Sequence, residues 1–155
     1  MNSAFQVLLK EFSVSKGITA EGSSYGLEFE CEGHTVMVIQ HPSDDAYLML
    51  DVSVIALDPE PPAAQLAMML QMNEAARFEH GWSAVMDSDM QVSVAASEPL
   101  QGLTIARLES LMLEGVERAQ ALAAILLDEV FDENSPPAES QIATRGEASV
   151  QMLRG

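Results

Sequence analysis

The side chains that could do chemistry in this sequence are few and far apart. Three histidines, His34, His41 and His80, could act as a base or a metal ligand, but no HxxxH or paired-cysteine spacing accompanies them. The single cysteine, Cys31, excludes an internal disulfide and a cysteine-based zinc cluster. It lies on the apolar side of an alternating segment, where a free cysteine behaves as a small hydrophobic residue. We therefore predict no metal site and no catalytic residue at these positions.

Two acidic clusters could in principle hold paired carboxylates or a calcium ion. They are Asp44 with Asp45, and Asp87 with Asp89. Each lies between two segments of strand-like pattern, where a hairpin needs polar turn residues, and each is too short for an EF-hand loop. No serine lies in a G-x-S-x-G setting. The sequence therefore favours turns at both clusters and predicts a protein with no cofactor and no enzyme activity.

The composition points to protein partners. The chain has 24 acidic and 7 basic side chains, a formal net charge of -17, so a phosphate backbone or an anionic membrane would be repelled at long range. Hydrophobic residues make up 48% of the chain and aromatic residues only 5%. No segment approaches the ~18 uninterrupted apolar residues of a membrane span, and the N-terminus lacks a basic leader. We expect a cytoplasmic protein that neither binds nucleic acid nor inserts into a membrane.

The spacing of apolar residues predicts an α+β fold with the order α-β-β-β-α-β-β-α, an antiparallel sheet packed by helices. The predicted helices span residues 3–14, 63–79 and 104–131, the last with Thr104 as N-cap, and the predicted strands span residues 25–31, 34–40, 46–57, 82–86 and 90–97. Residues 1–131 form one domain in this interpretation. Residues 132–155 are rich in Ser, Pro, Ala, Glu and Gln without periodicity, so we expect a disordered tail.

The predicted helix at residues 63–79 is apolar on nearly every side and must be covered on more than one of them. One explanation is that the helix at 104–131 of the same chain covers it. The other, which we favour, is that a second copy covers it in a homodimer. The Phe and Leu stripe of the helix at 3–14 raises a similar question, since it could be core or could leave a groove for a partner.

In their order and spacing these segments resemble the class I chaperones of bacterial type III secretion systems. The resemblance covers about residues 4–127 and is carried by FQVLLKEF, YGLEFECEGHTVMVIQ, AYLMLDVSVIALDPEPP, LAMMLQMNEAARFEHGW, MDSDMQVSVAASEPLQGL and ARLESLMLEGVERAQALAAIL. The loop after the first helix lacks the Leu-Gly-Leu-Pro type of sequence that is common in such chaperones. The resemblance implies a homodimer that binds the chaperone-binding segment of secreted effectors and keeps it extended, soluble and secretion-competent. The ATPase of the secretion system is a further candidate partner.

The resemblance also implies two sets of site residues. The cargo-binding set is Phe5, Leu8, Leu9, Phe12, Leu27, Phe29, Val36 and Val38. The dimer-interface set is Leu66, Met69, Leu70, Met72 and Trp82. Core packing within one chain is the competing explanation for every one of these side chains. A protein-binding regulator domain of the sensory-transduction-regulator type is the competing function.

Overall fold

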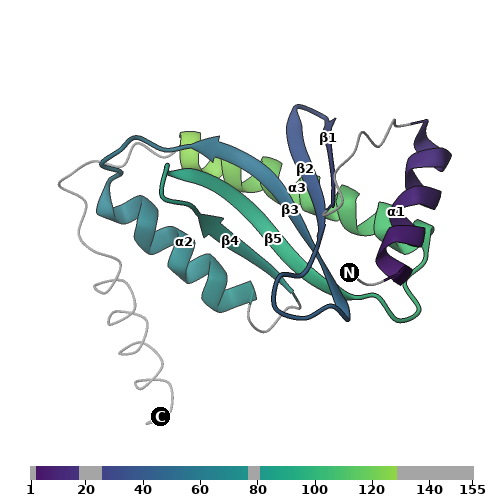
Figure 1. Ribbon diagram of the computed structural model, residues 1–155. Helices are drawn as coiled ribbons and strands as arrows, with labels where there is room; N and C mark the ends of the chain where they lie inside the picture. Colours follow the sequence, from purple (N-terminus) through teal and green to yellow (C-terminus); the bar gives the residue numbers. More distant parts are fainter. Residues whose placement is uncertain (1–2, 18–25, 77–80, 129–155) are drawn as a thin grey trace, which may run out of the picture.

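The computed structural model describes residues 3–17, 26–76 and 81–128. Its elements, in chain order, are α1 (Ser3–Lys16), β1 (Gly26–Cys31), β2 (His34–Gln40), β3 (Tyr47–Ala56), α2 (Ala63–Ala76), β4 (Trp82–Met86), β5 (Gln91–Pro99) and α3 (Ile105–Asp128) (Figure 1). The predicted α+β class and the predicted order of helices and strands are therefore confirmed. The predicted tail at 132–155 and the last residues of the predicted third helix lie outside the described residues.

The five strands form one sheet in the order β1-β2-β3-β5-β4, and every neighbouring pair is antiparallel. The first hairpin turns at Glu32 and Gly33, whose φ angles are 51° and 83°. Two positive φ angles are what a two-residue type I′ turn requires, and the glycine adopts one of them without strain. The chain then leaves β3 through α2 and returns to the sheet at β4, so that β5 lies between β3 and β4.

One face of the sheet is packed by α3, which contacts β2, β3 and β5 and runs along the far side of the strands in Figure 1. Because strand side chains alternate between faces, every second residue points to this helix. The fully buried side chains at this contact are Val36, Val38, Leu48, Leu50, Val52 and Val92 from the sheet and Leu108, Val116 and Leu122 from α3. Thr104 caps the helix as predicted, since its Oγ1 accepts a hydrogen bond from the Arg107 N–H at 3.2 Å.

At Gly115 the backbone of α3 lies directly against Trp82 of β4. A Cβ atom at Gly115 would lie 2.5 Å from Cη2 of Trp82 and 2.9 Å from Cγ2 of Val52. Both distances are shorter than a carbon–carbon contact of ~3.5 Å. The glycine therefore lets the indole ring pack directly under the helix backbone, and Trp82 is 4% exposed as a result.

The helix α2 runs alongside the edge strand β4 (Figure 1). Its Asn73 side chain binds both backbone groups of Ala84: Nδ2 donates to the carbonyl oxygen at 2.8 Å, and Oδ1 accepts from the N–H at 2.6 Å. The side-chain amide thus satisfies a strand edge that would otherwise have an unpaired N–H and C=O. At the other end of α2, Gln65 Nε2 donates to the carbonyl oxygen of Leu126 at 3.4 Å. The helix is therefore fixed to both β4 and α3.

The contact between Gly115 and Trp82 can be tested with Gly115→Ala. In an exposed helix this exchange raises stability by about 1 kcal/mol. Here the added methyl group overlaps a rigid ring, so we expect the free energy of unfolding to fall by ~1–3 kcal/mol. Urea unfolding followed by the fluorescence of Trp82, the single tryptophan, measures the change. In the reference variant Ala124→Gly, at an exposed site of α3, loss of the Cβ lowers stability by about 1 kcal/mol. A Gly115→Ala variant more stable than the parent would contradict this packing.

Candidate protein-binding site

The acidic clusters form turns, as predicted. Oδ1 of Asp87 accepts hydrogen bonds from the N–H of Asp89 at 2.8 Å and from the N–H of Gln91 at 2.9 Å, and Oδ1 of Asp44 accepts from the N–H of Ala46 at 3.0 Å. These carboxylates are therefore used to hold hairpin backbone. Over residues 3–17, 26–76 and 81–128, His, Cys, Asp and Glu side chains form no group of three that could hold a metal ion. The features left to bind a partner are surfaces.

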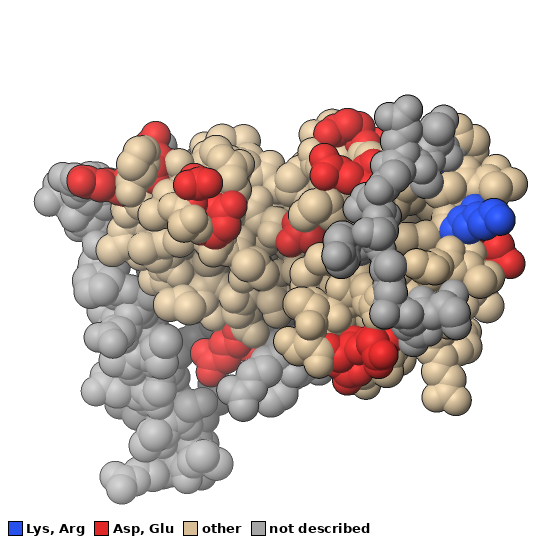
Figure 2. All heavy atoms as spheres, viewed as in Figure 1, with Lys and Arg blue, Asp and Glu red and all other residues tan. Residues whose placement is uncertain are grey.

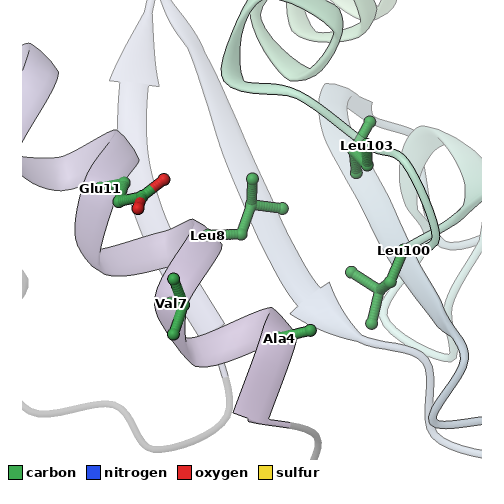
Figure 3. Close-up of a pocket in the computed structure, with 6 residues that line it drawn as sticks. All are labelled: Ala4, Val7, Leu8, Glu11, Leu100 and Leu103. Atoms are coloured by element: carbon green, nitrogen blue, oxygen red, sulfur yellow. The ribbon is translucent and has the colours of Figure 1, made fainter.

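A groove opens beside α1, between this helix and the segment that joins β5 to α3 (Figure 3). Its volume is about 310 Å³, and it is lined by Ala4, Val7, Leu8, Glu11, Leu100 and Leu103. The wall opposite α1 is fixed by backbone hydrogen bonds, since the N–H of Leu100 donates to the carbonyl oxygen of Ala46 at 2.8 Å. The lining is apolar except for Glu11 near one end, so the groove suits aliphatic side chains from a partner.

The eight residues of the predicted cargo-binding set come from α1, β1 and β2, and the fold brings them into one hydrophobic cluster. Phe5, Phe12, Val36 and Val38 are at most 1% exposed, Leu8 and Leu27 are buried, and Leu9 and Phe29 are half-buried. The rings of Phe12 and Phe29 pack with their centroids 6.0 Å apart. In a single chain these side chains are mostly core. Leu8 is the member that also lines the groove.

Sequence reasoning missed five of the six groove residues, and the large apolar ones among them are Val7, Leu100 and Leu103. Val7 is 55% exposed and lies away from the Phe and Leu stripe of α1. A signal was available, because Val7 and Val14 are seven residues apart and form a second, exposed apolar line on the helix. No signal identified Leu100 and Leu103. They lie in a segment marked as a break by Pro99 and Gly102, and only the tertiary fold brings that segment next to α1.

The predicted dimer-interface set is divided by the fold into buried and accessible members. Met69 and Trp82 are 6% and 4% exposed and belong to the core of one chain. Leu66 and Met72 are half-buried, whereas Leu70 is 70% exposed. Within Ala63–Ala76 the only charged side chain is that of Glu74. The helix α2 therefore presents an apolar and nearly uncharged surface, with Leu70 as its most exposed large side chain.

The charged side chains on the rest of the described surface are mostly acidic. Its four cationic side chains lie on α1 and α3, and three of them pair with a glutamate: Lys16 with Glu109 at 3.0 Å, Arg107 with Glu98 at 3.3 Å and Arg118 with Glu114 at 3.1 Å. Figure 2 shows acidic atoms spread over the visible face and basic atoms only at the end where α1 lies. None of the described helices is both long enough and apolar enough to cross a membrane.

One family model matches more than half of the chain. Residues 6–123 match the Tir chaperone protein (CesT) family. Among solved structures, the fold is similar to the ExsC–ExsE complex, with 18% identity, coverage of 81% of this chain and 97% of that chain, and a TM-score of 0.66. It is also similar to the HopA1–SchA chaperone–effector complex, with 14% identity, coverage of 77% and 93%, and a TM-score of 0.63.

Other comparisons are less informative. The fold is also similar to YbjN from E. coli, for which a role as a transcription regulator has been suggested, with 13% identity, coverage of 76% and 87%, and a TM-score of 0.53. No curated protein sequence matches the chain. At these identities the structural likenesses show a common fold, whereas the family match extends from α1 into α3. The chain therefore belongs to the CesT family of Tir chaperone proteins.

Proposed function

We propose that this protein is a cytoplasmic chaperone without enzyme activity that works as a homodimer. Its client is the N-terminal chaperone-binding segment of one or more type III secreted effectors, which it keeps extended, soluble and secretion-competent. Membership of the CesT family supports this proposal, and so do the structural likenesses to a chaperone–effector complex and to the ExsC–ExsE complex. The single observation that carries it is the open apolar groove between α1 and the segment before α3, on a molecule with a formal net charge of -17.

The groove can bind a client through the hydrophobic effect. Val7, Leu8, Leu100 and Leu103 contribute aliphatic surface to it, and each client side chain of Leu or Val size that becomes fully buried there contributes about 1.5–3 kcal/mol. Contacts of this kind depend on size and polarity more than on sequence, so clients of different sequence can bind. The acidic surface around the groove keeps the complex soluble.

Two copies would associate through α2 in this proposal. Each chain has a formal net charge of -17, so two copies repel each other at long range. Each α2 helix has only one acidic side chain, so a contact between two of these helices adds little to that repulsion. Leu70 supplies exposed apolar surface at the centre of the proposed contact. The family resemblance implies that Met69 and Trp82 lie at the interface. In this proposal they instead belong to the core beneath α2 within each chain.

Client binding can be tested by co-expressing the protein with N-terminal segments of candidate secreted effectors and measuring whether a complex co-purifies. The parent protein is expected to retain at least one segment. Val7→Asp puts a carboxylate into the apolar groove and is expected to weaken that complex by tenfold or more. Val14→Asp is the control, because Val14 is 75% exposed on the same helix and does not line the groove. Equal retention by both variants would argue against the groove. Failure of every segment to bind the parent would favour a regulator domain instead.

The dimer contact can be tested with Leu70→Asp and multi-angle light scattering. A carboxylate at the centre of an apolar interface loses hydration without gaining a partner, so we expect a monomer. Leu113→Asp is the control, because Leu113 is 56% exposed on α3, away from α2. We expect this variant to remain a dimer like the parent. A dimer of normal mass for Leu70→Asp would rule out α2 as the contact.

A further inference from the structure

Residues 150–154, with the sequence VQMLR, have an apolar pattern to which the proposed function assigns no role. They are called the tail segment below and lie outside the described residues. The preceding residues 132–149 contain a single large apolar side chain, that of Ile142. Side chains of an extended chain alternate between two sides, so Val150, Met152 and Arg154 would share one side. That side presents two apolar side chains followed by a cation.

The α1 wall of the groove has the complementary pattern. Along the helix, the apolar side chains of Ala4 and Val7 are followed by the carboxylate of Glu11 (Figure 3). From Ala4 to Glu11 the helix rises by ~10 Å, at ~1.5 Å per residue. From Val150 to Arg154 an extended chain spans ~13 Å, at ~3.3 Å per residue. The spacing of the apolar side chains and the cation therefore matches the spacing of the apolar wall and the carboxylate.

The groove has room for a few side chains only. Its volume of about 310 Å³ is near the lower end of the range for ligand pockets, which is ~300–1,000 Å³. Leu100 and Leu103 form the wall opposite α1, and Leu8 points toward them (Figure 3). None of the six residues that line the groove is basic. A short apolar segment with one arginine therefore meets no like charge in the lining.

The tail segment is long enough in reach to return to the groove of its own chain. The helix α3 begins beside the groove, which Leu103 lines, and runs to the opposite end of the molecule (Figure 1). Its 24 residues span ~35 Å. The 21 residues between Asp128 and Val150 average ~25 Å from end to end as a flexible coil and reach ~70 Å when extended. A return over the length of α3 therefore requires no stretched linker.

We propose that the tail segment binds in the groove of its own chain when no client is present, and that it competes with the client for this site. Val150 and Met152 contact the aliphatic walls, and Arg154 pairs with Glu11. Docking covers apolar surface that would otherwise be open to unspecific association. This inference rests on the proposed function and names a regulation of the same site.

The tether makes a weak contact sufficient. A segment on a flexible linker has an effective concentration on the order of 1 mM. A contact with a Kd of ~0.25 mM would then lower the apparent affinity of the client about fivefold. A client that binds well displaces the tail segment, whereas a weak one does not. The tail segment would thereby raise the selectivity of a groove whose apolar contacts discriminate little between sequences.

A second copy of this chain fits the groove less well than the tail segment does. Its helix α2 is apolar but has no basic side chain between Ala63 and Ala76 to pair with Glu11. The tail segment supplies apolar side chains and a cation together. Its docking within one chain is also independent of protein concentration, whereas occupation by a second copy would increase with concentration.

The test uses a fluorescein-labelled synthetic peptide of residues 145–155 and the full-length protein, with fluorescence anisotropy as the readout. Met152→Asp puts a carboxylate into the protein's own tail segment and should release it from the groove. We therefore expect the peptide to bind this variant about fivefold more tightly than the parent. Ile142→Asp is the matched control, because it makes the same kind of change in the tail outside residues 150–154, and it should bind the peptide like the parent.

Two results of this test would overturn the proposal. One is equal binding of the peptide to the Met152→Asp and Ile142→Asp proteins, which includes no binding to either. The other concerns the place of binding. Adding Val7→Asp to Met152→Asp should weaken peptide binding by tenfold or more, because the second carboxylate lies in the groove itself. Unchanged binding in this double variant would place the peptide elsewhere.

An exchange of charges tests the pairing of Arg154 with Glu11. A second peptide carries Arg154→Glu. We expect the Met152→Asp protein to prefer the arginine peptide by about threefold, and the same protein with Glu11→Arg to prefer the glutamate peptide. A preference of both proteins for the arginine peptide would trace the effect to the net charge of -17 and would overturn the pairing.

The regulatory role has its own readout, which is separate from that of the proposed function. An effector segment that the parent retains should bind Met152→Asp about fivefold more tightly than Ile142→Asp, and equal binding would overturn the competition. Peptide binding that depends on Val7, without capture of any effector segment, would leave the docked tail and remove the proposed client. Loss of effector segments in Val7→Asp, without peptide binding to Met152→Asp, would leave the chaperone and remove this inference.

Discussion

The packing of α3 against one face of a five-stranded sheet is the interaction on which the rest of this structure depends. The contact at Trp82 is possible only because residue 115 is a glycine, which admits the indole ring under the helix backbone. The large aliphatic side chains of β2, β3 and β5 are buried along the same helix. Since one long helix covers one face, the fold has other apolar surfaces that it does not bury, and those surfaces are where partners can bind.

Two such surfaces differ in chemistry. The groove beside α1 is aliphatic, with Glu11 near one end. The exposed side of α2 is apolar with a single charge, at Glu74. In a molecule of charge -17 these differences matter, because like charges oppose self-association wherever they meet. The nearly neutral surface is the one that a second copy can share, and the aliphatic groove is better suited to a client. The two hydrogen bonds between the Asn73 side chain and the Ala84 backbone fix α2 at the β4 edge and occupy the free backbone groups of that edge.

The sequence predicted the fold well because local periodicity and long-range packing agree. Leu27, Phe29 and Cys31 alternate with glutamates, and apolar residues of α3 recur every three or four positions. Each pattern identifies one apolar side, and the structure buries or half-buries that side. Site residues were harder to predict because the same apolar pattern describes a core residue and a binding residue. Phe5 and Phe12 are core in one chain although the family resemblance suggested cargo contact, and Trp82 lies under α3. Leu100 and Leu103 have no local pattern. Their surroundings come from segments distant in the chain.

The central claim is that a client binds in the groove beside α1 while α2 contacts a second copy. Hydrogen–deuterium exchange of the purified protein, with and without a bound effector segment, tests it directly. We predict that client binding slows exchange in α1 and in the segment around Leu100 to Leu103, and leaves exchange in α2 unchanged. Slower exchange confined to α2, with α1 unaffected, would contradict the account, because it would place the client where the second copy is proposed to bind.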